Sequence, residues 1–110
     1  MGGNDLIHTL AERLGNASEG TVSAAVRPWQ LMWKPAEGER DVVIETEPGK
    51  LAARLEALTD KGSVSPWGAD VSAEETAWRL LVTHLEEEYW AMPAGHGRLI
   101  IGADGVHTAS

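Results

Sequence analysis

Apolar residues recur at helical spacing in three segments of the chain. Leucines four residues apart predict a short helix over 5–14, which Gly15 would end. A second helix is expected over 48–61, because Pro48 suits a first helical turn and Lys61-Gly62 suits an end. The leucines that line one face of these two helices are Leu6, Leu10 and Leu14 in the first and Leu51, Leu55 and Leu58 in the second.

The third and longest helix is predicted over 73–91. Ser72 and Glu75 have the spacing of a capping box at its start, and Pro93 follows its end. At 100° per residue, Trp90 lies on the side opposite the apolar arc. That arc consists of Trp78, Leu81, Val82, Leu85, Tyr89 and Met92.

Strand-like alternation appears between the first two helices. Residues 21–34 read as one extended segment, bent or at a sheet edge because Pro28 interrupts it. After the turn 35–40, residues 41–46 return as a second strand, which makes the clearest hairpin of the sequence. The residues of the first strand expected to share one face are Trp29, Leu31 and Trp33.

A second hairpin is predicted at the C-terminal end. Residues 99–101 form a strand, Asp104-Gly105 supplies a type I′ turn, and residues 106–109 return. The order of elements is therefore α-β-β-α-α-β-β. We predict a single α+β domain over 1–110, with an antiparallel sheet of about four strands and helices packed on it. The pattern does not determine the strand order.

Composition limits the class of partner. The chain has 17 acidic and 9 basic residues and a formal net charge of −8, which disfavours nucleic acid and anionic membranes as partners. It has no cysteine, so disulfides and thiolate metal sites are excluded. We see no signal peptide and no run of apolar residues long enough for a membrane span, and we expect a cytoplasmic protein.

Motifs for catalysis are weak. His84 and Glu88 stand four residues apart on the long helix, with Glu87 beside them, but the second histidine of a zincin helix is missing. The sequence contains no nucleophile motif and no phosphate loop. We therefore expect no catalytic residue, no metal site and no cofactor. A small metal-dependent enzyme that uses His84 and Glu88 is retained as an alternative.

The remaining candidates point to binding. Two tryptophans fall away from the periodic core positions, and acidic residues gather on the long helix and along the first hairpin. Carboxylates on the hairpin would dock basic side chains, or they would protect an edge strand from aggregation. We interpret the chain as a non-catalytic interaction module of inhibitor, immunity or accessory type with a basic protein partner. The alternative is a homo-oligomeric structural or phage-type assembly subunit that pairs through strand edges. The candidate binding residues are Trp67, Trp90, Glu86, Glu87, Glu45 and Glu47.

Overall fold

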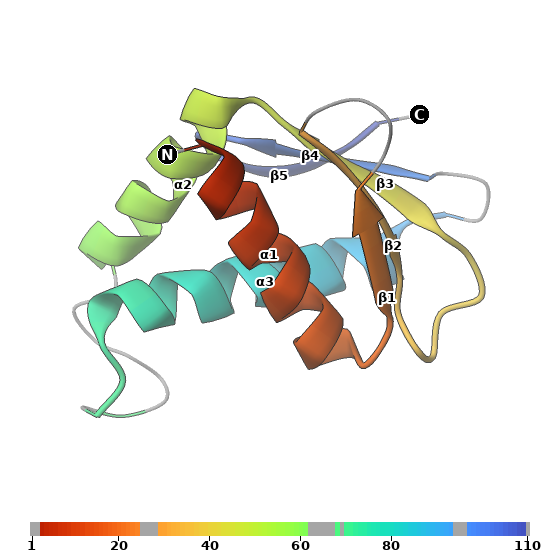
Figure 1. Ribbon diagram of the computed structural model, residues 1–110, viewed down its shortest axis with the longest axis horizontal. Coiled ribbons are helices and arrows are strands. Elements are labelled where there is room, and N and C mark those ends of the chain that lie inside the picture. The colour runs from red at the N-terminus through yellow and green to blue at the C-terminus, as the bar shows by residue number, and fades with distance from the viewer. Residues whose placement is uncertain (1–2, 25–28, 62–67, 69, 94–96, 110) are drawn as a thin grey trace.

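Five strands form one mixed sheet, and three helices pack against it (Figure 1). The computed structural model describes residues 3–24, 29–61, 68, 70–93 and 97–109. Its elements in chain order are α1 (Gly3–Ser18), β1 (Thr21–Ala24), β2 (Gln30–Lys34), β3 (Val42–Thr46), α2 (Pro48–Lys61), α3 (Ala73–Ala91), β4 (Arg98–Gly102) and β5 (Gly105–Ala109).

The α+β class is confirmed, and both predicted hairpins form, as β2–β3 and β4–β5. The sheet itself differs from the prediction of four antiparallel strands. It has five strands in the order β1-β2-β3-β4-β5, and β3 and β4 are parallel. The parallel pair arises because α2 and α3 together return the chain to the end at which β3 began, as a crossover connection must.

The segment 21–34 is not one interrupted strand. It forms β1 and β2, which pair antiparallel, with Thr21 opposite Lys34 and Ala24 opposite Leu31. Since each strand needs a neighbour for its backbone N–H and C=O groups, folding the segment on itself gives β2 a partner on both sides.

Alternation along the strands separates a core face from an outer face. The core residues of the central strands are almost fully buried and pack with the leucines of the helices: Leu31, Trp33, Val42, Ile44, Leu99 and Ile101. On the other face Met32, Val43 and Ile100 are half-buried, and Arg98 Nε lies 2.8 Å from Glu45 Oε1. The apolar side chains of alternate positions are thus used to join the sheet to the helices.

Helix α1 extends beyond the predicted end at residue 14. It continues through Gly15 to Ser18, whose hydroxyl donates to the Leu14 carbonyl at 2.7 Å. A glycine inside a helix costs about 1 kcal/mol, which the complete burial of Leu10 and Leu14 outweighs. Helix α3 begins as predicted, since the Ser72 hydroxyl accepts from the Glu75 amide.

Two turns dock closely because each contains a glycine. The amide of Ala36 donates to the Ser18 carbonyl at 3.2 Å, which joins the α1–β1 turn to the β2–β3 turn. A Cβ atom on Gly20 would collide with the Lys34 carbonyl, and one on Gly38 would collide with the Tyr89 hydroxyl. Only glycine permits this approach, and it brings both turns to the C-terminal half of α3.

In the described part of the chain, no helix combines the length and the apolar character needed to cross a membrane.

Candidate interaction site

Trp90 is the one large hydrophobic side chain that is exposed among the described residues, with 57% of its surface in solvent. It lies on α3, opposite the buried arc, as the helical spacing predicts. Its ring meets the ring of Tyr89 edge to face, with 4.8 Å between centroids and 84° between planes. Trp90 therefore stands on the surface beside a buried aromatic neighbour.

Tyr89, the buried neighbour of Trp90, is held in place by Arg40. The Tyr89 hydroxyl donates to the Arg40 carbonyl at 2.9 Å. In return, Arg40 Nη2 donates at 3.3 Å to the carbonyl oxygens of Tyr89 and Met92, at the C-terminal end of α3. The guanidinium also lies over the Tyr89 ring, 5.2 Å from its centroid. These contacts fix the end of α3 from which Trp90 projects.

A hollow of about 240 Å³ lies beside Trp90, and we call it the Trp90 hollow. Its wall combines one exposed aromatic ring with three carboxylates from three different parts of the chain, and no basic residue is among its described lining. The residues that line it are Ala17, Ser18, Glu19, Trp33, Pro35, Ala36, Glu37, Glu86 and Trp90.

Local structure places each carboxylate. Glu19 follows the last residue of α1 with a positive φ of 54°, the left-handed conformation common just after a helix end. Glu37 lies in the β2–β3 turn, and Glu86 lies one turn before Trp90 on α3. At the base, Trp33 Nε1 donates to the Ser18 hydroxyl at 3.1 Å. Polar atoms of the base are thus partnered within the chain.

The electrostatics of the hollow are uncompensated. Among the described residues, no cation forms an ion pair with Glu19, Glu37 or Glu86. Burial raises the pKa of the Glu86 carboxyl above its usual range, because the charged form has lost part of its hydration. A cation entering the hollow would stabilise the charged form of all three side chains.

A neighbouring hollow lies between α1 and α3 and has a volume of about 440 Å³. Unlike the Trp90 hollow, it contains a carboxylate that is paired with basic residues of the chain. There Arg13 Nη1 and Nη2 donate to the two Glu75 carboxylate oxygens at 2.8 and 2.6 Å, and Arg79 Nε donates to the same carboxylate at 3.0 Å. The hydrogen bonds from Arg13 and then Arg79 lower the pKa of Glu75 to about 2. The negative charge of Glu75 is thus neutralised by Arg13 and Arg79.

The structure divides the predicted binding residues. Trp90 and Glu86 line one hollow, whereas Glu87 is exposed on α3 and does not line it. Trp67 lies outside the described residues. Glu19 and Glu37 were not among the predicted site residues, because they join α3 only through the docking of two turns. The glycines that follow them, Gly20 and Gly38, are the sequence feature that could have indicated the docking of the two turns.

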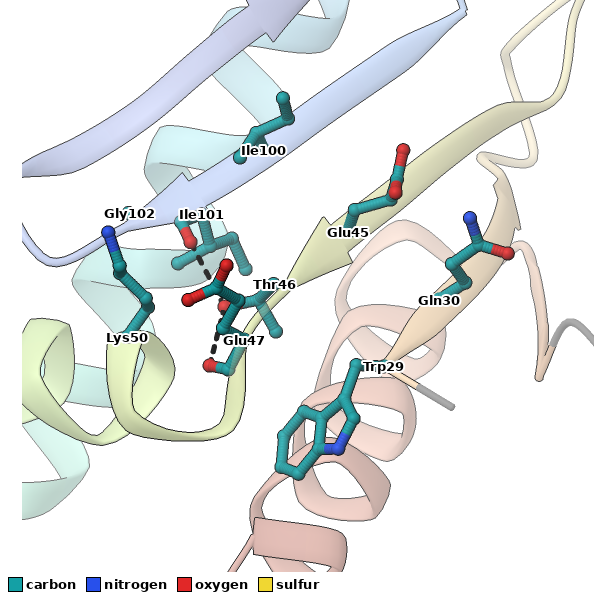
Figure 2. A pocket seen from close by; sticks show the side chains of 9 residues that line it. All are labelled: Trp29, Gln30, Glu45, Thr46, Glu47, Lys50, Ile100, Ile101 and Gly102. Atoms are coloured by element: carbon teal, nitrogen blue, oxygen red, sulfur yellow. Dashed lines mark hydrogen bonds between the residues drawn. The ribbon is translucent and has the colours of Figure 1, made fainter. Parts of the chain in front are cut away.

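Glu45 and Glu47 line a different hollow, which we call the sheet-end pocket (Figure 2). Trp29 lines it too, while it also packs against the hydrophobic core. Trp29 precedes β2, has a positive φ of 67° and is only half-buried. Its backbone conformation removes it from the alternation of the strand.

His84 and Glu88, the candidate metal ligands, are both half-buried on α3. Within the described ranges, no three histidine, aspartate or glutamate side chains gather as a metal ion would require. No family model matches the chain, and no curated protein or solved structure is significantly similar to it.

Proposed function

We propose that this protein is a non-catalytic interaction module that binds a protein partner by accepting a lysine or arginine side chain in the Trp90 hollow. The observation that supports this most is the combination of an exposed tryptophan with three carboxylates that lack a cation among the described residues. We propose that such a module acts as an inhibitor, an immunity protein or an accessory or assembly protein.

The chemistry of the wall suits a cation on a long side chain. The face of a tryptophan attracts a guanidinium or ammonium group, by about 0.5–1 kcal/mol at an exposed site and more when it is desolvated. Carboxylates then form charge-assisted hydrogen bonds with the same group. The volume of about 240 Å³ lies below the usual range of drug-sized sites, and it suits one side chain better than a cofactor.

The same arrangement has the form of a binding hot spot. Trp90 is held beside the fixed Tyr89, so it loses little side-chain entropy when a partner covers it. The carboxylates around it come from the α1–β1 turn, the β2–β3 turn and α3, so a partner would contact all three of these segments. The net charge of −8 adds a long-range attraction for a basic partner.

A capture experiment tests the proposal. Wild-type protein, Trp90→Ala and Glu86→Gln are immobilised and exposed to an extract of the source cell. Glu56→Gln serves as a control, because it removes one charge from an exposed position on α2 that does not line the hollow. We expect one protein to be retained by the wild type and the control, and to be lost with Trp90→Ala and reduced with Glu86→Gln. Equal retention by all four would contradict the proposal.

A further inference from the structure

The sheet-end pocket lies where the parallel strands β3 and β4 end. Carboxyl ends of parallel strands are a common place for ligand sites in sheets flanked by helices. The pocket holds about 330 Å³, within the range of small-molecule sites. Its lining residues are Trp29, Gln30, Glu45, Thr46, Glu47, Lys50, Ile100, Ile101 and Gly102 (Figure 2).

Trp29 is held in a strained conformation at the wall of this pocket. A bulky residue with φ of 67° is a true outlier, and it persists only where the surrounding structure holds it. The Thr46 amide donates to the Trp29 carbonyl at 3.1 Å, which anchors the backbone to the end of β3. The half-buried indole of Trp29 thus lies at the pocket, whereas that of Trp33, within β2, is fully buried.

Charges of both signs surround the pocket. Glu45 is paired with Arg98, whose Nε lies 2.8 Å from its carboxylate. Glu47 and Lys50 are exposed, and the Lys50 amide donates to the Glu47 carbonyl at 3.0 Å, which ties the first turn of α2 to the residue just before it. Arg98 does not line the pocket, so once Glu45 is paired the lining leaves one carboxylate, that of Glu47, and one ammonium group, that of Lys50, to meet a ligand that carries both signs.

The apolar and charged groups occupy different sides. Figure 2 shows the indole of Trp29 on one side of Thr46 and Glu47, and Lys50 on the other. The Thr46 hydroxyl is already used, since it donates to the Ile101 carbonyl at 3.0 Å. A ligand would therefore find a flat aromatic wall at one end and a carboxylate beside an ammonium at the other.

From this arrangement we infer that the sheet-end pocket binds a free aromatic amino acid in its zwitterionic form. The ring stacks on Trp29, the ligand carboxylate meets Lys50, and the ligand ammonium meets Glu47. Each part of the ligand has one counterpart in the pocket. The site shares no lining residue with the Trp90 hollow, so its failure would leave the proposed function untouched.

Calorimetry and amide NMR with L-phenylalanine test this inference on the whole chain. Phenethylamine lacks the carboxylate, 3-phenylpropionate lacks the ammonium, and L-alanine lacks the ring. We expect L-phenylalanine to bind and to shift the amide signals of Thr46 and Gly102, and each of the three analogues to bind at least tenfold more weakly. Absence of binding at millimolar L-phenylalanine, or equal binding of an analogue, would overturn the inference.

Variants separate the contributions of the pocket. Trp29→Ala, Lys50→Gln and Glu47→Gln should each weaken L-phenylalanine binding at least tenfold. Lys50 and Glu47 are exposed, so their variants keep the test informative if Trp29→Ala fails to fold. Lys34→Gln and Glu56→Gln remove the same charges from exposed positions outside the pocket and should leave binding unchanged. Unchanged binding in both Lys50→Gln and Glu47→Gln would contradict the zwitterion assignment.

Discussion

The rings of Trp33 and Trp90 both contact Tyr89, but their exposure differs. Trp33 is 0% exposed, whereas Trp90 is 57% exposed. We expect Trp33→Ala to lower the free energy of unfolding by about 3–5 kcal/mol, because it opens a core cavity. Trp90→Ala should lower it by about 1 kcal/mol or less, since only an edge contact is lost. Urea denaturation of both variants measures the difference. A loss of about 3 kcal/mol for Trp90→Ala would place that side chain in the core.

Glu86 gives a prediction about pH. Its folded-state pKa is raised by burial, so its neutral form is favoured in the folded protein, and its contribution to stability declines as the pH rises through that pKa. At neutral pH, Glu86→Gln should therefore raise the melting temperature slightly while it weakens partner binding. Glu87→Gln, at the exposed next position, is the matched control. A lower melting temperature for Glu86→Gln would show that its carboxylate already has a stabilising cation.

Trp90 and Glu86 could be found from the sequence, because helical spacing alone places a residue on a face of a helix. The start of β2 after Trp29 could not be predicted, since nothing in an alternating run indicates a positive φ at a tryptophan. Glu19 and Glu37 reach the site only after two turns have docked, and such contacts are set by tertiary packing. A site assembled from separate segments is therefore only partly visible in the sequence.

Helices α1 and α3 are tied by the Arg13–Glu75 ion pair, and both residues line the hollow between these helices. The lowered pKa of Glu75 means that its stabilising effect is complete above about pH 4.5 and is lost as the pH falls toward about 2. Both side chains keep about a third of their surface in solvent, so we expect Glu75→Gln to cost about 1 kcal/mol at neutral pH.

The control for this pair is Glu74→Gln, which lies in the same first turn of α3 and is exposed. This variant removes a negative charge that interacts with the dipole of α3, but it leaves the ion pair with α1 in place. Urea denaturation at neutral pH and near pH 2 should show a difference between Glu75→Gln and wild type that shrinks in acid. A constant difference would assign the effect to packing.

Among larger elements, the hydrophobic pattern correctly gave the helices and the two hairpins, whereas the parallel pairing of β3 with β4 could not be inferred. Periodicity records which face of a strand is buried, and it carries no information on which strand lies beside it. The division of residues 21–34 into β1 and β2 was missed for the same reason, since both halves alternate in the same way.

In the molecule as a whole, most apolar side chains lie in the core, and the surface carries an excess of negative charge. The core joins residues from all three helices and from the central strands. Among the described residues the exposed exception is Trp90, at a hollow that has three carboxylates and no basic residue in its described lining. A surface of this kind attracts and orients a basic partner over the distance at which charges act in solution.

The indole N–H signals in an NMR spectrum of the protein test the central claim most directly. The Trp90 signal is assigned by its loss in Trp90→Phe, and the spectrum is recorded with and without the protein captured by the wild type. We predict that the partner shifts or broadens the Trp90 signal and leaves that of Trp78, which is buried against α1, in place. An unchanged Trp90 signal in the saturated complex would contradict the account.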